Sequence, residues 1–285
     1  MATFYNQARL TLDGRVVSSN QTEGEVVTRV TLTKTPLSTD YGPGDNIVYA
    51  ITMANTDATP KTDITLIDNL GEFTTIDGVM VVPLTYVAGS IRLYTNGVLS
   101  TAPTVNPGPP LVISGINIPA GGNVLIVYET VANEFAPRDN NASITNTIRA
   151  EGEELCDELS DSANVPTRDE PELSIAKAIC PESVSCGDEI TYTFIIQNTG
   201  NTAVVATDNL IVSDTFLPPL KNITVTLNGV TLTEGVDYSY NELTGEFATL
   251  NGVVTVPAAT YTTDPITGVV NTTPGVTVLT ITGTV

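Results

Sequence analysis

The chain has 285 residues and a formal charge of −21, with 11 basic residues against 32 acidic ones. This balance excludes nucleic acids and anionic membranes as main partners, because phosphate surfaces are bound by clustered lysines and arginines. Histidine is absent, and we find no nucleophile elbow, phosphate loop or dinucleotide fingerprint, so we expect neither an enzyme nor a cofactor. The acidic clusters lack the ligand order of a calcium loop, so we expect no metal site and assign the acidity to solubility.

Short runs of alternating apolar and polar residues follow one another along the chain. Thr, Val and Ile dominate these runs, and Gly, Pro, Asn or Asp bound them. This pattern is typical of antiparallel β-strands that bury one face. The length is sufficient for two domains with separate cores. We therefore predict an all-β protein with two tandem β-sandwiches.

Residues 1–27 are predicted to form a hairpin arm. Alternating residues within positions 4–26 flank Asp13-Gly14, a pair that favours a tight hairpin turn. A similar hairpin is predicted over 144–165, where it closes a domain. The arm therefore resembles the closing hairpin of a repeat, but it stands at the start of the chain.

Residues 28–166 and 167–285 are predicted to be two copies of one domain. The aligned positions are 31–35 with 174–178, Gly44-Asp45 with Gly187-Asp188, Tyr49 with Tyr192, and Asn55-Thr56 with Asn198-Thr199. Val285 corresponds roughly to Val131, so the second copy has no counterpart of the hairpin at 144–165. We therefore expect a complete first domain and an incomplete second one.

These motifs resemble the bacterial conserved-repeat domain, also called domain of unknown function eleven. The residues that carry the resemblance are Pro43-Gly44-Asp45, Tyr49, Asn55-Thr56, Asp68-Asn69-Leu70, Asn146-Thr147-Ile148, Gly187-Asp188, Asn198-Thr199-Gly200 and Asp214. The resemblance implies immunoglobulin-like or prealbumin-like β-sandwiches, which occur in tandem on bacterial surfaces. It implies structure and assembly more than activity.

An incomplete sandwich exposes a strand edge and an apolar groove that must be covered. In our main interpretation, the arm of one chain completes the second domain of the next, and identical subunits form a head-to-tail filament. The alternative is a monomeric surface adhesin whose arm is idle or completes its own second domain. Self-completion is disfavoured because about five residues tie the arm to the first domain, a reach of roughly 17 Å.

Lysine, asparagine and aspartate recur at matching positions of the two repeats. They resemble the set that forms intramolecular isopeptide bonds in pilins and adhesins of Gram-positive bacteria. Burial favours a neutral amine as nucleophile and a protonated carboxyl as proton donor. The predicted sets are Lys34, Asn146 and Asp68 in the first domain, and Lys177, Asp214 and Asn6 of the next chain in the second. Ordinary ion pairs at strand edges are the alternative.

The three cysteines divide into a predicted pair and a single residue. Cys180 and Cys186 flank a loop of five residues, so we predict a disulfide between them in an oxidising compartment. Cys156 is left over as a free thiol or an intermolecular bridge. Too few ligands remain for a zinc site.

The first residues lack the basic and apolar regions of a signal peptide, and no transmembrane stretch occurs. A fibre made inside a cell that later lyses, such as a sporulating mother cell, would need no such signal. We therefore expect an extracellular filament on a cell or spore surface. It would not insert into a membrane, and its anchoring protein is unknown.

Overall fold

The computed structural model describes residues 2–26, 29–155 and 158–285. Within these residues the secondary structure is strands, apart from a single 3-10 turn at Ala206–Asp208. The predicted all-β class with antiparallel sandwiches is therefore confirmed. The chain divides into two compact units, residues 1–136 with 143–166, and residues 137–142 with 167–285. We call the β-sandwich of each unit the first sandwich and the second sandwich.

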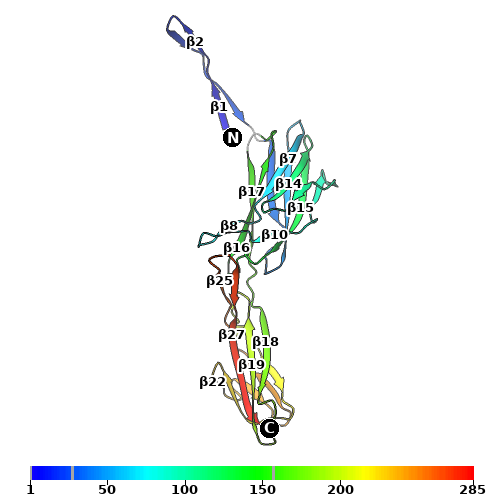
Figure 1. Cartoon of the computed structure of the whole chain (residues 1–285), viewed down its shortest axis with the longest axis vertical. Coiled ribbons are helices and arrows are strands. Elements are labelled where there is room, and N and C mark those ends of the chain that lie inside the picture. Colours follow the sequence, from blue (N-terminus) through cyan, green and yellow to red (C-terminus); the bar gives the residue numbers. More distant parts are fainter. Residues whose placement is uncertain (1, 27–28, 156–157) are drawn as a thin grey trace. The chain divides into compact units, whose positions relative to one another are not determined.

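The arm, residues 2–26, is a two-stranded antiparallel ladder with one interruption (Figure 1). Strand β1 (Ala2–Asn6) pairs with β4 (Thr22–Val26), and β2 (Arg9–Leu12) pairs with β3 (Arg15–Ser18). Asp13 and Gly14 turn the chain at the tip with φ angles of 48° and 80°. Both angles are positive, as the tight hairpin turn requires.

The first sheet of the first sandwich has the order β12-β11-β15-β6-β5, with β10 also paired to β15. All its pairings are antiparallel. The strands are β5 (Val30–Pro36), β6 (Asn46–Asn55), β10 (Leu84–Tyr86), β11 (Arg92–Thr95), β12 (Val98–Leu99) and β15 (Asn123–Ala132). Their alternation places every second side chain in the core.

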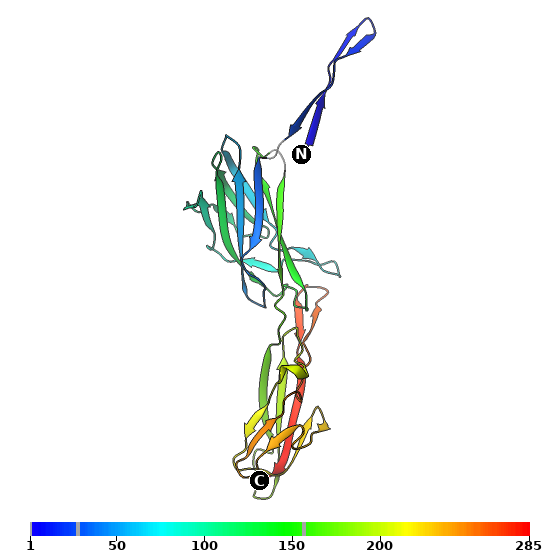
Figure 2. The same ribbon diagram turned by 180° about the vertical axis from the view of Figure 1, so that it is seen from behind.

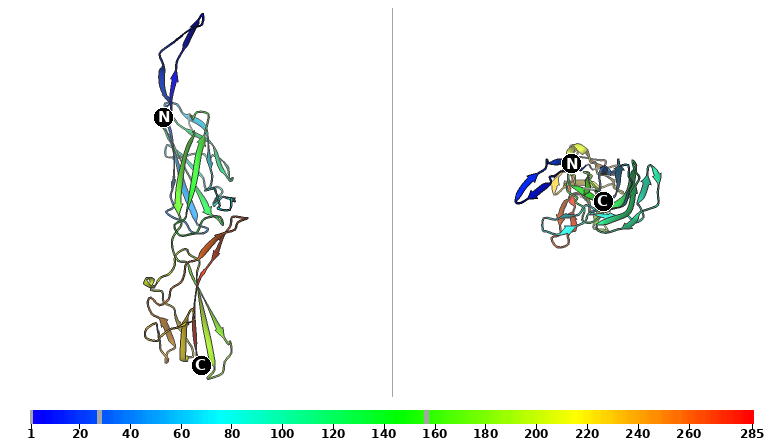
Figure 3. Two further views of the ribbon diagram at one scale, coloured as in Figure 1. Left: turned by 90° about the vertical axis from the view of Figure 1, so that its left-hand side faces the viewer. Right: turned by 90° about the horizontal axis from the view of Figure 1, so that it is seen from above.

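The second sheet of the first sandwich has the order β13-β14-β7-β16-β17. Its strands are β7 (Lys61–Asp68), β13 (Thr104–Asn106), β14 (Leu111–Ile118), β16 (Ser143–Glu151) and β17 (Leu159–Pro166). We call β16 and β17 the closing hairpin; its two strands run side by side in Figure 3. A small separate hairpin joins β8 (Phe73–Thr74) and β9 (Met80–Val81).

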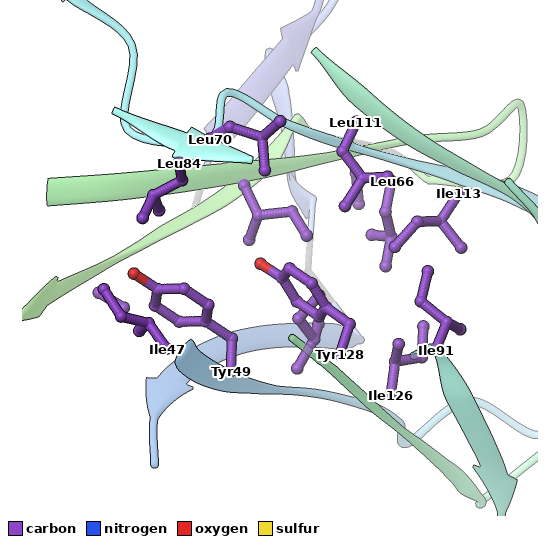
Figure 4. Close-up of a cluster of buried hydrophobic side chains, with 14 of the residues drawn as sticks. Ile47, Tyr49, Leu66, Leu70, Leu84, Ile91, Leu111, Ile113, Ile126 and Tyr128 are labelled. Carbon is purple, nitrogen blue, oxygen red and sulfur yellow. The ribbon is translucent and has the colours of Figure 1, made fainter. Parts of the chain in front are cut away.

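Apolar side chains from both sheets fill the first sandwich (Figure 4). Ile47 and Ile126 come from one sheet, and Leu66, Leu111 and Ile113 come from the other. All five side chains are buried. The sandwich is therefore held together by a continuous apolar core, with each buried side chain contributing about 1.5–3 kcal/mol.

The first sheet of the second sandwich has the order β18-β19-β27-β21-β22 (Figure 2). Its strands are β18 (Leu173–Cys180), β19 (Glu189–Asn198), β21 (Lys221–Leu227), β22 (Val230–Thr231) and β27 (Gly275–Thr284). The order repeats that of the first sandwich, with β18 in the place of β5 and β19 in the place of β6. The two sheets therefore have the same strand order.

The second sheet of the second sandwich is smaller. Its order is β20-β24-β23, with β20 (Ser213–Thr215), β23 (Tyr238–Tyr240) and β24 (Glu246–Thr249). A separate hairpin pairs β25 (Thr260–Thr263) with β26 (Val270–Thr273). Phe216, Tyr238 and Phe247 contribute a cluster of aromatic rings to the core.

The two sandwiches differ at β7 and β20, the strands that follow β6 and β19 in the chain. In the first sandwich β7 is paired on both sides, with β14 and with β16. In the second sandwich β20 is paired with β24, and among the described residues no strand pairs with its other edge. Residues 167–285 therefore contain no equivalent of the closing hairpin in the described part of the chain.

Candidate functional site

The core of the first sandwich contains an ion pair. Lys34 lies on β5, and Asp68 is the last residue of β7 in the opposite sheet. The Lys34 Nζ atom lies 2.7 Å from Asp68 Oδ2, and both side chains are 0% exposed. A lysine inside an apolar core is tolerated only when a partner compensates its charge. Asp68 is that partner.

Two tyrosines line the same site. Tyr49 and Tyr128 are cross-strand neighbours on β6 and β15, and their rings stack with centroids 5.6 Å apart. Figure 4 shows both hydroxyls directed to the same side of the core. The Tyr128 hydroxyl donates a hydrogen bond to Asp68 Oδ2, and Lys34 Nζ lies 4.8 Å from the Tyr49 ring centroid. The ion pair is therefore walled by aromatic rings.

Asn146 enters this cluster from the closing hairpin. It lies on β16, two residues before Ile148, which pairs directly with Asp68. Asn146 is fully buried, and its Nδ2 atom has no hydrogen-bond partner among the described residues. Its Oδ1 atom accepts a hydrogen bond of 3.2 Å from the Gly71 N–H. A buried amide N–H group without an acceptor is unusual, because such a group costs free energy to bury.

The loop after β7 is fastened to the closing hairpin around Asn146. Asn69 Oδ1 accepts hydrogen bonds from the N–H groups of Gly71 and Thr147, at 3.0 and 2.9 Å. The Asn69 N–H donates to the Thr147 carbonyl at 3.0 Å. Gly71 has a φ of +75°, and a Cβ atom there would lie 2.7 Å from the Ile144 side chain. Glycine is therefore required at position 71, where the loop approaches the side-chain oxygen of Asn146.

Burial changes the acid–base behaviour of this cluster. Desolvation lowers the pKa of Lys34 to about 8, although the neighbouring Asp68 carboxylate opposes the shift. Desolvation also raises the pKa of Tyr49 and Tyr128 above the usual range, and the charge of Asp68 adds to the rise. Lys34 is therefore much closer to its neutral, nucleophilic form at neutral pH than an ordinary lysine.

The second sandwich contains the same ion pair in an open setting. Lys177 on β18 donates to Asp214 Oδ2 on β20. The side chains are 41% and 20% exposed. Tyr192 takes the place of Tyr49, and Ile281, its cross-strand partner, takes the place of Tyr128. The pair is conserved between the two sandwiches, but its burial is not.

The exposure extends along the whole of β18. In the first sandwich β17 of the closing hairpin contacts β5, and Asp161 on β17 accepts a hydrogen bond of 2.7 Å from the Lys34 N–H. At the start of β5, Val30 is 4% exposed, whereas Leu173 at the start of β18 is 41% exposed. Ile175 is also exposed. The second sandwich therefore presents an apolar strand where the first one is covered.

The arm carries its apolar side chains on its surface. The exposed large apolar residues of the arm are Phe4, Tyr5, Leu10, Leu12, Val16 and Val17. The Phe4 ring covers Gly24 on the opposite strand, where a Cβ atom would lie 2.3 Å from the ring. Asn6, the last residue of β1, is exposed and pairs with Thr22.

The predicted disulfide is not present. Cys180 and Cys186 are free and exposed thiols in the structure. The β18–β19 ladder places Cys180 opposite Thr191, whereas Cys186 lies in the connecting loop before β19 begins at Glu189. The loop length alone suggested the pair, but the register places another residue opposite Cys180. Cys156 lies outside the described residues.

Sequence reasoning identified the lysines, the acids and the asparagines, but not the groups around them. Tyr49 and Tyr192 were visible as a repeated position, without an assigned role. Tyr128 and Gly71 gave no signal, because their part in the site depends on contacts between strands far apart in the chain. Within the described residues, no helix is long and apolar enough to cross a membrane.

No protein-family model matches the chain, and no curated protein matches it. The resemblance to the conserved-repeat family therefore stays a prediction. Among solved structures, the pilus backbone of Streptococcus pneumoniae is similar at 10% identity and a TM-score of 0.35, over 86% of this chain and 55% of that one.

Two further similar structures cover about half of this chain. A collagen adhesin from Staphylococcus aureus matches at 12% identity and a TM-score of 0.32, over 53% of this chain and 55% of that one. A family 123 glycoside hydrolase from Clostridium perfringens matches at 13% identity and a TM-score of 0.32, over 50% of this chain and 27% of that one. These similarities are too weak to assign a function.

Proposed function

We propose that the protein is the structural subunit of an extracellular or spore-surface filament, in which the arm of one copy completes the second sandwich of the next. The observation that carries the proposal is the exposure of β18, whose counterpart β5 is covered by the closing hairpin. An exposed apolar strand beside an unpaired strand edge needs a covering hairpin from outside residues 167–285.

The arm has the side-chain order that this groove requires. The buried positions of β16 are Ile144, Asn146, Ile148 and Ala150, and the alternating positions of the arm are Phe4, Asn6, Ala8 and Leu10. Both series run apolar, asparagine, apolar, apolar. Alternation fixes which face a strand buries, so this register would place Phe4 and Leu10 in the groove together with Asn6.

The contact would be directional. The arm and the groove are different surfaces, so each subunit has one donor and one acceptor, and such contacts propagate as an open chain. The first sandwich already contains its own closing hairpin and offers no groove to an arm. Growth would therefore proceed head to tail.

The buried cluster of the first sandwich supports a covalent bond from Lys34 to Asn146, with Asp68 as the proton carrier. The proton of the Lys34 ammonium moves to Asp68, and the neutral amine attacks Cγ of Asn146. The Gly71 N–H stabilises the charge that develops on Oδ1. The Cγ–Nδ2 bond breaks, Nδ2 takes up a proton through Asp68, and ammonia leaves. One amine and one amide become a secondary amide plus ammonia.

The same reaction would join neighbouring subunits. Lys177 would attack Asn6 of the docked arm, and Asp214 would carry the proton in place of Asp68. A covalent joint between subunits would make the filament resistant to denaturants.

Deletion of residues 1–26 tests the proposal. We expect the intact chain to sediment as long polymers and to form filaments in electron micrographs, and the truncated chain to stay monomeric. The Tyr5→Ser variant is the matched control, because Tyr5 lies on the opposite face of β1 from Phe4 and Asn6. Circular dichroism checks that the truncated chain retains its β structure.

Two results would contradict the proposal. Filaments of normal length from the truncated chain would show that the arm is dispensable. An intact chain that stays monomeric at all concentrations would favour the monomeric adhesin with an idle or self-completing arm.

A further inference from the structure

Three aromatic rings lie around the ammonium group of Lys177, whose side chain is 41% exposed. Its Nζ atom lies 4.7 Å from the ring centroid of Tyr192, 5.3 Å from that of Phe194 and 5.4 Å from that of Phe216. All three distances fall within the range of cation–π attraction. Asp214 receives the hydrogen bond of the same group. We call these three rings the aromatic cage.

One ring of the cage has an aliphatic counterpart in the first sandwich. Phe194 is the residue directly opposite Lys177 in the β18–β19 ladder. The residue directly opposite Lys34 in the β5–β6 ladder is Ile51. The two ladders have the same register, so this difference is a substitution at one structural position.

A second ring differs in the same way. Phe216 follows Asp214 by two residues, as Leu70 follows Asp68. Both residues are buried in the core of their own sandwich. Phe216 approaches Lys177, whereas the two rings within range of Lys34 are Tyr49 and Tyr128. Aromatic rings at these two positions, Phe194 and Phe216, therefore occur in the second sandwich and not in the first.

Different contacts hold the side chains of Lys34 and Lys177 in place. The closing hairpin covers Lys34, and burial fixes its side chain. Lys177 has no such cover, and a half-exposed lysine can turn its flexible side chain into water. Aromatic faces attract an ammonium group that still has water on one side, so they can hold it without a cover.

We infer that Phe194 and Phe216 are positioning residues that keep the Lys177 ammonium beside Asp214, where Asn6 of an incoming arm would meet it. This inference rests on the proposed function for the identity of the second reactant. The cage holds the ammonium beside Asp214 until the arm docks. The arm then excludes water, and the proton passes to Asp214 as the amine attacks Asn6 and ammonia is released.

Chemical modification of the full chain tests the cage without any docking. We use the monomeric fraction, kept at a concentration below that of assembly, and an amine-reactive acylating reagent. Mass spectrometry measures the acylation of Lys177 against that of the exposed Lys221. The Phe194→Ile and Phe216→Leu variants introduce the residues of the first sandwich. In each variant we expect Lys177 to be acylated about 2- to 5-fold faster, the factor that one exposed cation–π contact provides.

The Phe247→Leu variant is the matched control. Phe247 is a buried ring in the same core and contacts Phe216, but its ring is not among those that approach Lys177. We expect Phe247→Leu to leave the acylation of Lys177 unchanged. Equal acylation rates in wild type, Phe194→Ile and Phe216→Leu would overturn the inference, as would an equal increase in Phe247→Leu.

Assembly assays on the same full chains distinguish an effect on the position of Lys177 from an effect on docking of the arm. Sedimentation measures polymer formation, and denaturing electrophoresis with ammonia release measures the covalent joint. We expect both cage variants to polymerise as the wild type does and to form the covalent joint about 2- to 5-fold more slowly. Unchanged covalent rates would overturn the inference and leave the filament intact. A wild-type chain that does not polymerise would overturn the proposed function, and acylation would still decide whether the cage holds Lys177.

Discussion

The first and second sandwiches contain the same lysine–aspartate pair in the same place, yet the pair is buried in one and exposed in the other. Lys34 and Asp68 are 0% exposed, whereas Lys177 and Asp214 are 41% and 20% exposed. The strands that carry the two pairs correspond in order and register. The difference arises from the closing hairpin, which the first sandwich has and residues 167–285 lack in the described part of the chain.

The lysine–aspartate pair alone does not determine the properties of the site. Burial beneath the closing hairpin lowers the pKa of Lys34 and brings Asn146 to the cluster. The second sandwich has the acid and the amine but neither the cover nor the amide. One hairpin therefore supplies both the desolvation and the amide that the proposed bond would use.

The largest expected effect comes from making the two sandwiches alike. We propose a chain extended after Val285 by a copy of residues 133–141, from the connection between β15 and β16, followed by a copy of residues 2–26, so that Ala2 takes the place of Ala142 in the proposed register. The added arm should occupy the groove of its own second sandwich, so this chain should not accept a neighbour. Added in small amounts to the wild type, it should shorten the filaments seen by electron microscopy.

The control for this extension carries the same added segment with Phe4→Asp and Leu10→Asp in the copied arm. Charged residues at these two positions should prevent the added hairpin from entering an apolar groove. The control chain should therefore polymerise. Equal polymerisation of both extended chains would show that the groove does not select the arm.

The next largest effect should come from Asn146→Ala in the first sandwich. The proposed bond closes a loop of more than 100 residues, and the chain-entropy relation used for disulfides gives about 4–5 kcal/mol for such a loop. The wild type should be lighter than its sequence by one ammonia molecule, whereas the variant should show no such loss of mass. The free energy of unfolding of the variant should be lower than that of the wild type by about 4–5 kcal/mol. Intact mass and denaturant titration measure the two quantities.

Asn164→Ala is the matched control for this measurement. Asn164 lies on the same hairpin, but its amide donates to Ser143 and Thr145 at the surface. This variant should retain the cross-link and lose less than about 1 kcal/mol. A wild-type chain with no loss of ammonia would contradict the covalent bond and leave Lys34 and Asp68 as a structural ion pair.

Much of this arrangement could be predicted from the sequence, because the two repeats are aligned without gaps around Lys34 and Lys177. Alternation placed both lysines on the apolar face of a first strand. The position of Asn146 in a closing hairpin followed from the same repeat. Local patterns of this kind are fixed by strand periodicity and survive in any sandwich.

The rest depended on contacts that no local pattern encodes. Tyr128 reaches Asp68 only because β15 and β7 face each other across the core. The Gly71 N–H meets Asn146 because the loop after β7 is fastened to β16 by Asn69. The disulfide prediction failed for the same reason, since the spacing of two cysteines does not reveal which residue the ladder places opposite Cys180.

A smaller effect is expected from Phe4→Ala in the arm. In the proposed register Phe4 takes the place of buried Ile144, so the variant loses an anchor worth about 1.5–3 kcal/mol. The concentration needed for polymerisation should rise about 10- to 100-fold, as sedimentation can measure. Tyr5→Ala on the opposite face of β1 should change it by less than about 3-fold. Equal effects of the two variants would contradict the register.

The smallest effect concerns the pH dependence of the uncross-linked first sandwich. In Asn146→Ala the Lys34 amine stays free, with a pKa of about 8 when folded and 10.5 as its ordinary value. The unfolded chain then binds more protons than the folded chain across this interval, so the free energy of unfolding should rise with pH. Between pH 7 and pH 9.5 we expect a gain of about 2 kcal/mol from this group, measured by denaturant titration.

The upper limit of this pH range is set by the two tyrosines of the site. Burial raises the pKa of Tyr49 and Tyr128 when folded, so above about pH 10 the unfolded chain loses their protons first and stability should fall again. Adding Lys34→Met to Asn146→Ala removes the titrating amine. The double variant should lose the rise below pH 9.5 and keep the fall above pH 10. A rise of the same size in the double variant would show that another group, and not Lys34, is responsible.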